Sequence, residues 1–436
     1  MLLSKLRFIG LISLLGMVSC AALPNAQYDN LRAIDKGTEA DHIALLRHEG
    51  EEISGTHFVS GNKVTLLTDG AATYPAMLAA IRGAQKRIDM ESFLFDEGEG
   101  KQFARALIQR RMAGVEVNLI YDSFGSIDTP SEMFDRMEEA GIHLVEYNPI
   151  DPVSVIDTSA NHRDHRKLLL IDGKTAFVGG VNISAVYKLK LKVKNALHIH
   201  NKDQDIEKLP WRDTHLKISG PVVAEFEKFF METWNEQDGG PISDPPPTPR
   251  AKQGDILVQA IDGTPDMDKF SIYRSLLMSI ALAHTSIHLT TGFFVPTPDL
   301  VDALQNAAKR GVDVTLILPS HSDSDLALKA GHASYEDLME AGVKIYEFQD
   351  AVLHAKTAVI DGLWSTVGSS NLDWRSVVLN DECNAVVLDK GFSDDLEKLF
   401  QQDIKHSKYI DSAVWSERPW WEVLDEWKAR AVEVML

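Results

Sequence analysis

Apolar residues follow two spacings along the chain after about residue 60. The segments 63–70 and 88–95 read as strands, whereas the apolar positions of 74–87 recur at helical spacing. The same order continues through two further helix–strand units, which have Gly114 and Gly141 near the helix ends. Strands that alternate with helices in this way predict an α/β domain with helices covering a largely parallel sheet.

The same order of elements begins again near residue 254. The segment 274–294 repeats the pattern of 77–95, and 300–320 repeats that of 103–123. A stretch rich in proline and glycine, 239–253, separates the halves, and its proline triplet cannot join a helix or a central strand. The expected segments are a signal peptide (1–20), an extension (21–60), a first domain (61–238), the linker (239–253) and a second domain with a helical C-terminal end (254–436).

One polar motif occurs in both halves. It reads HRKLLLIDGKTAFVGGVN over 165–182 and HAKTAVIDGLWSTVGSSN over 354–371. Residues two apart in a strand point to the same face, so the His and Lys of each copy project together. The corresponding residues, each pair separated by the same interval, are His165 and His354, Lys167 and Lys356, Asp172 and Asp361, Gly179 and Gly368, and Asn182 and Asn371.

These residue types suit chemistry at a phosphate. Imidazole is a nucleophile and a general acid near neutral pH, and lysine holds phosphate oxygens as a point charge. Asn182 and Asn371 would add neutral donors, as would the Ser369 hydroxyl, which Gly180 replaces in the first copy. The small residues at 179–180 and 368–369 would let the backbone approach a bound group. The set predicts phosphoryl-group transfer without a metal or another cofactor.

The doubled H-x-K-x4-D-x6-G-x2-N signature resembles the phospholipase D superfamily, and the flanking runs 211–223 and 369–382 are similar to those of bacterial cardiolipin synthases. The resemblance extends from about residue 61 to the C-terminus. It implies two α/β/α sandwich repeats, packed about a pseudo-twofold axis so that both motifs share one site. It also implies that one histidine forms a phosphohistidine, while the other protonates the leaving oxygen and then activates the incoming hydroxyl. The usual family order gives His165 the first role and His354 the second.

Further roles follow from the same resemblance. The family places an acidic residue downstream of each motif to orient a catalytic imidazole. Asp213 fits this position for the first copy and Glu382 for the second, although a salt bridge would also explain either residue. The motif residues Asp172 and Asp361 are expected to hold their turns together rather than to contact substrate.

The N-terminus predicts export. Lys5 and Arg7 precede a mostly apolar, uncharged run over 8–18, which is short for a membrane span and typical of a signal peptide. Cys20 stands between small residues, and the segment resembles a bacterial lipobox, which implies a lipidated cysteine. We therefore expect a lipoprotein anchored in the cell envelope, on the periplasmic side in a Gram-negative organism. An ordinary cleaved signal or a short uncleaved anchor would explain the same residues.

The lysine-rich segment 187–195 and the tryptophan-rich C-terminal segment each have two possible interpretations. Lysines alternate with apolar residues over 187–195, which suits either anionic lipid headgroups or an edge strand protected by lysines. Four tryptophans near the C-terminus would form a membrane-interface belt or pack a terminal helix. They are Trp415, Trp420, Trp421 and Trp427.

The leading hypothesis is a phosphatidyltransferase that joins two phosphatidylglycerols into cardiolipin or moves the phosphatidyl group to another alcohol. Hydrolysis by water, as in a phospholipase D, is the alternative within the family. A nuclease of the superfamily is disfavoured by the two motifs, the membrane-type N-terminus and a formal net charge of -20. A non-catalytic envelope lipoprotein is disfavoured because both motifs are intact. The expected partners are a phospholipid and a membrane, without nucleic acid; the oligomeric state and the acceptor alcohol stay open.

Overall fold

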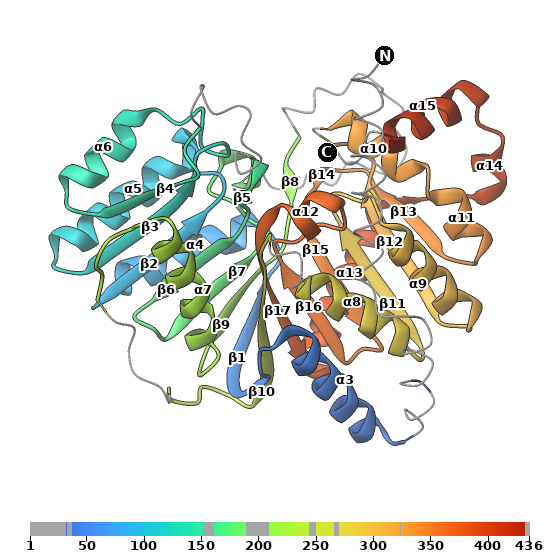
Figure 1. The fold of residues 1–436 in the computed structure, drawn as a ribbon, viewed down its shortest axis with the longest axis horizontal. Coiled ribbons are helices and arrows are strands. Elements are labelled where there is room, and N and C mark those ends of the chain that lie inside the picture. The colour runs from blue at the N-terminus through green and yellow to red at the C-terminus, as the bar shows by residue number, and fades with distance from the viewer. Residues whose placement is uncertain are drawn as a thin grey trace, which may run out of the picture.

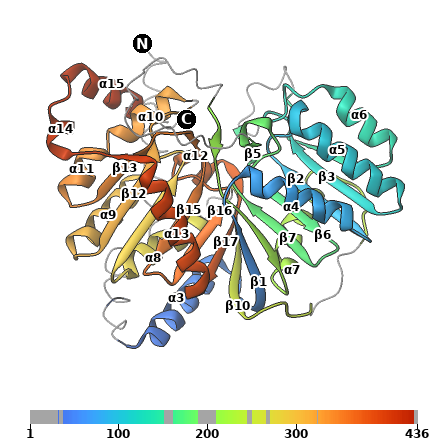
Figure 2. The ribbon, with the colours of Figure 1, turned by 180° about the vertical axis from the view of Figure 1, so that it is seen from behind.

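The computed structural model describes residue 32 and residues 37–150, 161–188, 209–243, 250–265, 270–322 and 324–431. Figure 1 shows two lobes side by side, each built from a sheet with helices on both faces. Rotation by 180° about the vertical axis gives a closely similar outline, with the first half now on the right (Figure 2). The two α/β repeats predicted from the sequence are therefore confirmed.

The first half contains most of the chain up to α7. Its strands are β1 (Val59–Leu67), β2 (Arg87–Ser92), β3 (Glu116–Asp122), β4 (His143–Tyr147), β5 (Arg163–Asp164), β6 (Lys167–Ile171), β7 (Thr175–Gly179), β8 (Trp211–Arg212) and β9 (His215–Ser219). Its helices are α4 (Gly70–Gly83), α5 (Glu97–Met112), α6 (Ser131–Glu139), the 3-10 helix η2 (Ala185–Lys188) and α7 (Val223–Glu236).

The second half repeats this plan. Its strands are β10 (Ile256–Gly263), β11 (Ser286–Thr291), β12 (Asp313–Pro319), β13 (Lys344–Phe348), β14 (Val352–Leu353), β15 (Lys356–Ile360), β16 (Trp364–Gly368), β17 (Asn380–Leu388) and β18 (Ser407–Tyr409). Its helices are α8 (Ser271–Leu282), α9 (Pro298–Lys309), α10 (Asp325–His332), α11 (Tyr335–Glu340), α12 (Trp374–Val378), α13 (Lys390–Lys405), α14 (Ser412–Ser416) and α15 (Trp420–Ala431).

The sheets of the two halves are continuous, because β1 pairs with β10 in antiparallel fashion. Outward from this junction the strands run β1-β9-β7-β6-β2-β3-β4 on one side and β10-β17-β16-β15-β11-β12-β13-β18 on the other. Only β2-β3-β4 and β11-β12-β13 are parallel within this order. The sheet is thus mixed rather than largely parallel, because tight turns join β6 to β7 and β15 to β16 and make them antiparallel hairpins.

Apolar packing also crosses the junction. One core cluster contains residues from α7 and α13 together with strands of both sheets, for example Phe226, Val258 and Leu396. The N-terminal helix α3 (Glu39–Ser54) packs with the second half, where Leu46 belongs to the core beside α8. Because burying apolar surface drives folding, this shared core holds the two motifs in a constant relative position.

The C-terminal helices carry the tryptophans. Trp415 packs against Tyr335, with ring centroids 5.0 Å apart. Trp420, Trp421 and Trp427 are instead 71%, 54% and 62% exposed. The packing interpretation therefore holds for the first tryptophan and is wrong for the other three. Among the described residues, no helix is both long enough and apolar enough to cross a bilayer.

Candidate active site

The two motif histidines meet at the junction between the halves. His165 lies directly before β6 and His354 directly before β15, and their ring centroids are 6.4 Å apart. Both side chains are almost fully buried. The structure thus brings the two distant motifs into one site.

Each histidine is held by a carboxylate of the opposite half. His165 Nδ1 lies 3.0 Å from both carboxylate oxygens of Glu382, and His354 Nδ1 lies 2.6 Å from Asp213 Oδ2. The two carboxylates therefore take the orienting positions, but the pairing crosses over: Asp213 does not serve the first motif, and Glu382 does not serve the second. An Nδ1–H that donates to the carboxylate leaves the Nε2 lone pair available for chemistry.

The crossing is built into the backbone. The His165 N–H donates to the Asp381 carbonyl, and the His354 N–H donates to the Arg212 carbonyl, at 2.9 and 2.8 Å. These bonds extend two short parallel pairs, β5 with β17 and β8 with β14, that join the halves. Consequently, His165 is anchored to the strand that carries Glu382, and His354 to the strand that Asp213 directly follows.

The motif lysines lie beside the histidines. Lys167 Nζ donates to the His165 carbonyl at 2.5 Å and stands 5.1 Å from the centroid of the Phe93 ring. Lys356 Nζ makes the corresponding hydrogen bond to the His354 carbonyl. Burial lowers the pKa of Lys167 to about 7, although the nearby Glu382 opposes this shift. Loss of hydration strengthens the attraction of such an ammonium for a phosphate oxygen.

Both imidazoles are neutral at neutral pH. Burial lowers the pKa of His165 to about 4, against the opposing charge of Glu382. Burial, followed by the charges of Lys356 and Lys167, holds the pKa of His354 well below its usual range. A bound phosphodiester would bring a negative charge that raises both pKa values. Without a bound phosphodiester both imidazoles are therefore neutral, and substrate itself favours the protonated form that an acid requires.

The motif aspartates form turns outside the site. Asp172 has a φ of 52° and accepts hydrogen bonds from the backbone N–H groups of residues 85–87. Asp361 has a φ of 54° and does the same for residues 284–286. Each carboxylate thus ties its β-hairpin turn to the preceding helix–strand connection.

The glycines of the motif make room for a neighbouring strand rather than for a ligand. A Cβ at Gly179 would lie 2.6 Å from His215 Cα, and one at Gly368 would overlap Asn384 Oδ1. The following position differs between the halves. A Cβ at Gly180 would overlap the carboxylate of Asp213. The structure therefore gives these small residues a packing role and corrects the expectation that they admit a bound group.

Ser369 occupies the position that corresponds to Gly180. Its Oγ accepts a 2.9 Å hydrogen bond from the Cys383 N–H. Its hydroxyl also helps to lower the pKa of Glu382, in addition to the larger effect of His165. Ser369 thus interacts with the Glu382 carboxylate, whereas Gly180 leaves space for the Asp213 carboxylate.

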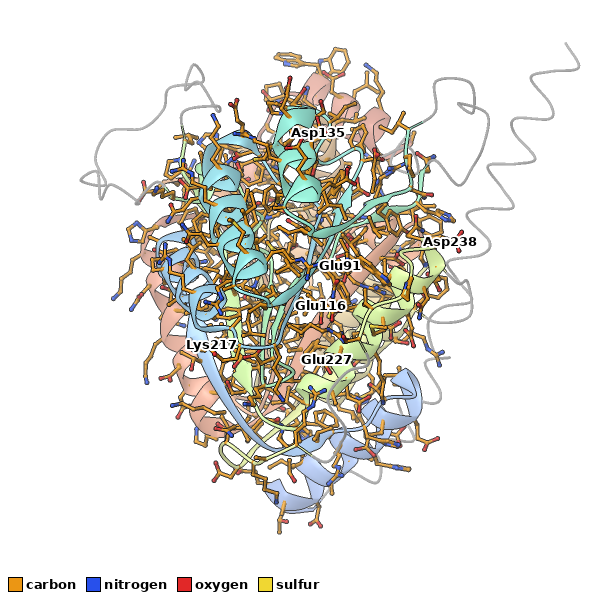
Figure 3. The ribbon with its side chains drawn as sticks, turned by 90° about the vertical axis from the view of Figure 1, so that its left-hand side faces the viewer. Glu91, Glu116, Asp135, Lys217, Glu227 and Asp238 are labelled. Atoms are coloured by element: carbon orange, nitrogen blue, oxygen red, sulfur yellow. The ribbon has the colours of Figure 1, made fainter. Side chains whose placement is uncertain are left out.

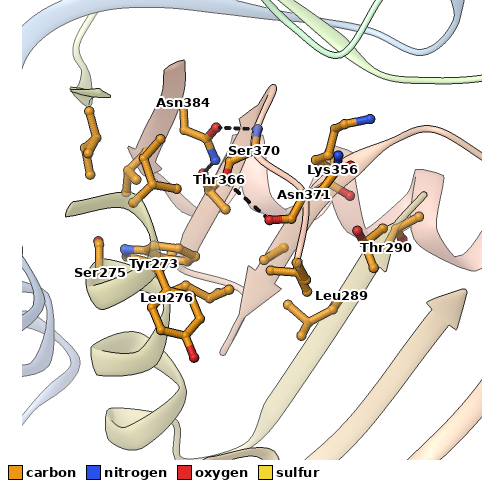
Figure 4. A pocket seen from close by; sticks show the side chains of 18 residues that line it. Tyr273, Ser275, Leu276, Leu289, Thr290, Lys356, Thr366, Ser370, Asn371 and Asn384 are labelled. Carbon is orange, nitrogen blue, oxygen red and sulfur yellow. Dashed lines mark hydrogen bonds between the residues drawn. The ribbon is translucent and has the colours of Figure 1, made fainter. Parts of the chain in front are cut away.

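The two motif asparagines have different surroundings. Asn182 Oδ1 accepts from the Leu94 N–H at 3.3 Å, and its Nδ2 donates to the Tyr187 hydroxyl at 2.9 Å. Asn371 Oδ1 is buried and has no hydrogen-bond partner within the described part of the chain. A small, mostly apolar cavity of about 40 Å³ lies beside Asn371 and Lys356, against α8 (Figure 4). It is separate from the larger catalytic cavity described below. Asn371 therefore retains an acceptor for a ligand, whereas the amide of Asn182 is used by its own half.

The catalytic cavity has a volume of about 770 Å³ as the described residues line it. Both histidines and both motif asparagines line it. The other walls contain aromatic residues, two arginines and further polar groups. These include Phe93, Phe124, Trp211, Phe293, Arg163, Arg375, Asp373 and Asn380.

Tyr187 is a site residue that the sequence did not reveal. It belongs to η2, not to a strand, and its hydroxyl lies 3.2 Å from His354 Nδ1. Its counterpart in the repeat is Ser376, so the tyrosine is not part of the repeated pattern. Lys188, which follows it, pairs with Glu99 at 2.8 Å. The remaining lysines of 187–195 lie outside the described residues, as does Cys20.

Arg166, the middle residue of the first H-x-K, points to the other side of the strand. It is buried; its Nε donates to the Glu382 carbonyl at 3.2 Å, and its guanidinium lies 3.6 Å from Glu91. Figure 3 shows Glu91 in the interior of the first half. Burial raises the pKa of Glu91 to about 7. The arginine thus links the first half to β17, the strand that carries Glu382. The second motif has Ala355 at the corresponding position.

Two facing H-x-K histidines on paired α/β repeats, each oriented by a carboxylate, define an enzyme of the phospholipase D type. The family model described as "Cardiolipin synthase, PLD-like domain" matches residues 77–209 and again 276–404. A cardiolipin synthase of Geobacillus kaustophilus is 32% identical over 374 residues, which cover 84% of this chain and 71% of that protein. Cardiolipin synthase A of Pectobacterium atrosepticum is 32% identical over 406 residues, 92% of this chain and 80% of its own.

A solved structure supports the fold. The phosphatidylserine synthase of Haemophilus influenzae Rd KW20 matches with a TM-score of 0.67 and 12% identity, over 90% of this chain and all of that one. The chain therefore belongs to the cardiolipin synthase family of phospholipase D-like proteins, and it is a phosphatidyltransferase of the phospholipase D type.

Proposed function

We propose that the chain makes cardiolipin by transferring the phosphatidyl group of one phosphatidylglycerol to a second. The observation that carries the proposal is the pair of buried, neutral histidines facing one cavity, each with Nδ1 held by a carboxylate. The similarity to proteins named cardiolipin synthase, over most of the chain, supports this choice of substrate.

The reaction would proceed in two displacements. His165 Nε2 attacks phosphorus, and the bond between phosphorus and the oxygen of the headgroup glycerol breaks. His354 donates a proton to that oxygen, and glycerol leaves. A hydroxyl of the second phosphatidylglycerol then returns a proton to His354 and attacks phosphorus, which breaks the N–P bond. Lys167 and Lys356 would neutralise the charge of the phosphate oxygens, and Asn371 Nδ2 would donate a hydrogen bond to one of them. Glu382 and Asp213 stabilise whichever imidazole is charged.

Hydrolysis is the second candidate, because a cavity of about 770 Å³ has room for water beside the histidines. The products distinguish the two reactions. Purified chain would be incubated with phosphatidylglycerol vesicles, and lipids would be identified by mass spectrometry. The proposal predicts cardiolipin and glycerol from wild type and from His57→Ala, whose side chain is 83% exposed away from the site. Phosphatidic acid as the sole lipid product would replace the synthase with a phospholipase D.

We also propose that the chain acts at a membrane of the cell envelope, held there by a lipid on Cys20. The apolar segment that precedes this cysteine and the exposed Trp420, Trp421 and Trp427 support the proposal. Labelled palmitate fed to expressing cells should be incorporated into the wild-type chain and not into Cys20→Ala. Equal labelling of both, or labelling of neither, would remove the lipoprotein assignment.

A further inference from the structure

Two strand pairs that the repeat makes equivalent lie beside the catalytic cavity, and their residues differ in character. Arg163 pairs with Asn380 where β5 meets β17, and Val352 pairs with Trp211 where β14 meets β8. Each pair thus combines one residue ahead of a motif histidine with one residue ahead of an orienting carboxylate. Arg163 and Asn380 both line the cavity and form a polar, cationic wall, whereas only Trp211 of the apolar pair lines it.

Arg375 adds to the cationic wall. It lies on α12, four residues after Asn371, and its counterpart in the first half is Val186. Its Nη2 donates to the Asn161 carbonyl at 3.1 Å, and both residues line the cavity. Burial lowers the pKa of Arg375 against the opposing charge of Asp373, and the charge of Arg163 adds a smaller lowering effect. Arg163 and Arg375 therefore place two positive charges on the lining of one cavity.

The same wall has two unsatisfied acceptors. Asn371 and Asn380 are 8% and 7% exposed, and within the described chain neither side-chain oxygen has a hydrogen-bond partner. A buried acceptor without a donor is unfavourable, so each oxygen favours a ligand that brings a hydroxyl. Both asparagines line the cavity. A ligand matched to this wall would combine hydroxyl donors with a negative charge.

We propose that Arg163, Arg375, Asn371 and Asn380 form the binding site for the headgroup of the acceptor, a glycerol that carries its own phosphodiester. The inference rests on the proposed function and specifies which acceptor the site selects. The first phosphate occupies the centre between the histidines. The arginines bind the second phosphate, and the asparagine oxygens accept hydrogen bonds from glycerol hydroxyls.

The spacing agrees with this assignment. Arg163 precedes His165 by two residues, which is about 6.6 Å of extended chain. That distance is comparable with a three-carbon glycerol bridge between two phosphates. Arg163 Nη1 donates to Ser123 Oγ at 2.9 Å and to the Asn148 carbonyl at 3.0 Å, and it lies 3.8 Å from Asp122 Oδ2. Asp373 caps α12 through the Ser376 N–H at 2.7 Å, so its carboxylate already has a structural partner.

Competition between a charged and a neutral acceptor tests the inference. Phosphatidylglycerol vesicles would be incubated with enzyme and ethanol, and the ratio of cardiolipin to phosphatidylethanol would be measured in one mixture. Arg375→Gln should lower this ratio about tenfold or more relative to wild type, because a charge-assisted contact to the acceptor alone is lost. Arg375→Lys should recover part of the ratio. Arg105→Gln, on the exposed face of α5, is the matched control and should keep the wild-type ratio.

The outcomes separate the two proposals. Cardiolipin from wild type with an unchanged ratio in Arg375→Gln would overturn the acceptor site and leave the synthase in place. Wild type that makes phosphatidylethanol and phosphatidic acid but no cardiolipin would overturn both. Asn380→Ala provides a second variant without any change of charge, and it should lower the same ratio if its oxygen binds the headgroup.

Discussion

His165 and His354 occupy equivalent positions, but their neighbours differ. His165 Nδ1 meets both oxygens of Glu382, and the pKa of that carboxyl is lowered, because His165 and Lys167 together outweigh its burial. His354 Nδ1 meets one oxygen of Asp213 and also the Tyr187 hydroxyl. Burial raises the pKa of Asp213 to about 6.

This difference indicates a division of labour. Glu382, whose pKa is lowered, stays ionised; it orients His165 and stabilises the positive charge that His165 gains on attack, which suits a nucleophile. Asp213 is closer to neutrality at pH 7, so the His354 pair gains or loses a proton more readily. A repeated fold has thus provided two similar histidines, and a few unlike neighbours make one suited to attack phosphorus and the other to move protons.

The largest expected effect on the difference between His165 and His354 comes from exchanging the small residues beside their carboxylates. Gly180→Ser should push Asp213 away from His354, because a Cβ at that position overlaps the carboxylate. Loss of a hydrogen bond to a charged group, about 1.5–3 kcal/mol, corresponds to a fall in kcat of roughly 10- to 150-fold.

Ser369→Gly is the matched exchange in the other half. It removes a neutral hydroxyl and leaves Glu382 on His165, so we expect a fall of only about 2- to 10-fold. Thermal unfolding of both variants would show whether they remain folded. Equal losses in two folded variants would contradict the unequal support of the carboxylates.

A smaller effect is expected from Tyr187→Phe, which keeps the ring and removes the hydroxyl beside His354. The expected fall in kcat is about 3- to 10-fold, with little change in KM. Tyr346→Phe, on the distant strand β13, controls for the loss of a hydroxyl. A loss confined to KM would show that Tyr187 contacts substrate instead of positioning the histidine.

The pH profile gives the same comparison in wild type. Asp213 is ionised above its pKa of about 6 and protonated below it. A protonated Asp213 no longer stabilises the imidazolium of His354, so kcat/KM should be retained above pH 6 and fall below it. Measurement of kcat/KM in buffers from pH 4 to 8 checks this; a flat profile down to about pH 4 would exclude Asp213 as the limiting group.

The repeated motif and the two orienting carboxylates could be predicted from the sequence, whereas the pairing of those carboxylates and the role of Tyr187 could not. His165, Lys167 and their counterparts stood out because the same spacing occurs twice. The crossing of Asp213 and Glu382 depends on two-residue strand pairs between the halves, which are too short to leave a periodic pattern. The sequence contains no repeated signal for Tyr187, because its counterpart is Ser376.

Other differences have equally local causes. The small size of Gly179 and Gly368 predicts close approach of a ligand, but the next strand of the sheet fills the space beside them. The parallel part of the sheet was predicted from helix–strand alternation, whereas the hairpins at both motifs make the rest antiparallel. Tertiary neighbours, which the sequence does not specify locally, decided each of these cases.

The most direct test of the account is to trap the covalent intermediate. A phosphatidyl ester with a p-nitrophenol leaving group needs no acid, so His354→Ala should release one equivalent of p-nitrophenol and then stop. Peptide mass spectrometry should find the phosphatidyl group on His165, and His165→Ala should give no burst. An adduct on His354 in the His165→Ala variant, with none on His165 in His354→Ala, would contradict the assignment of the two histidines.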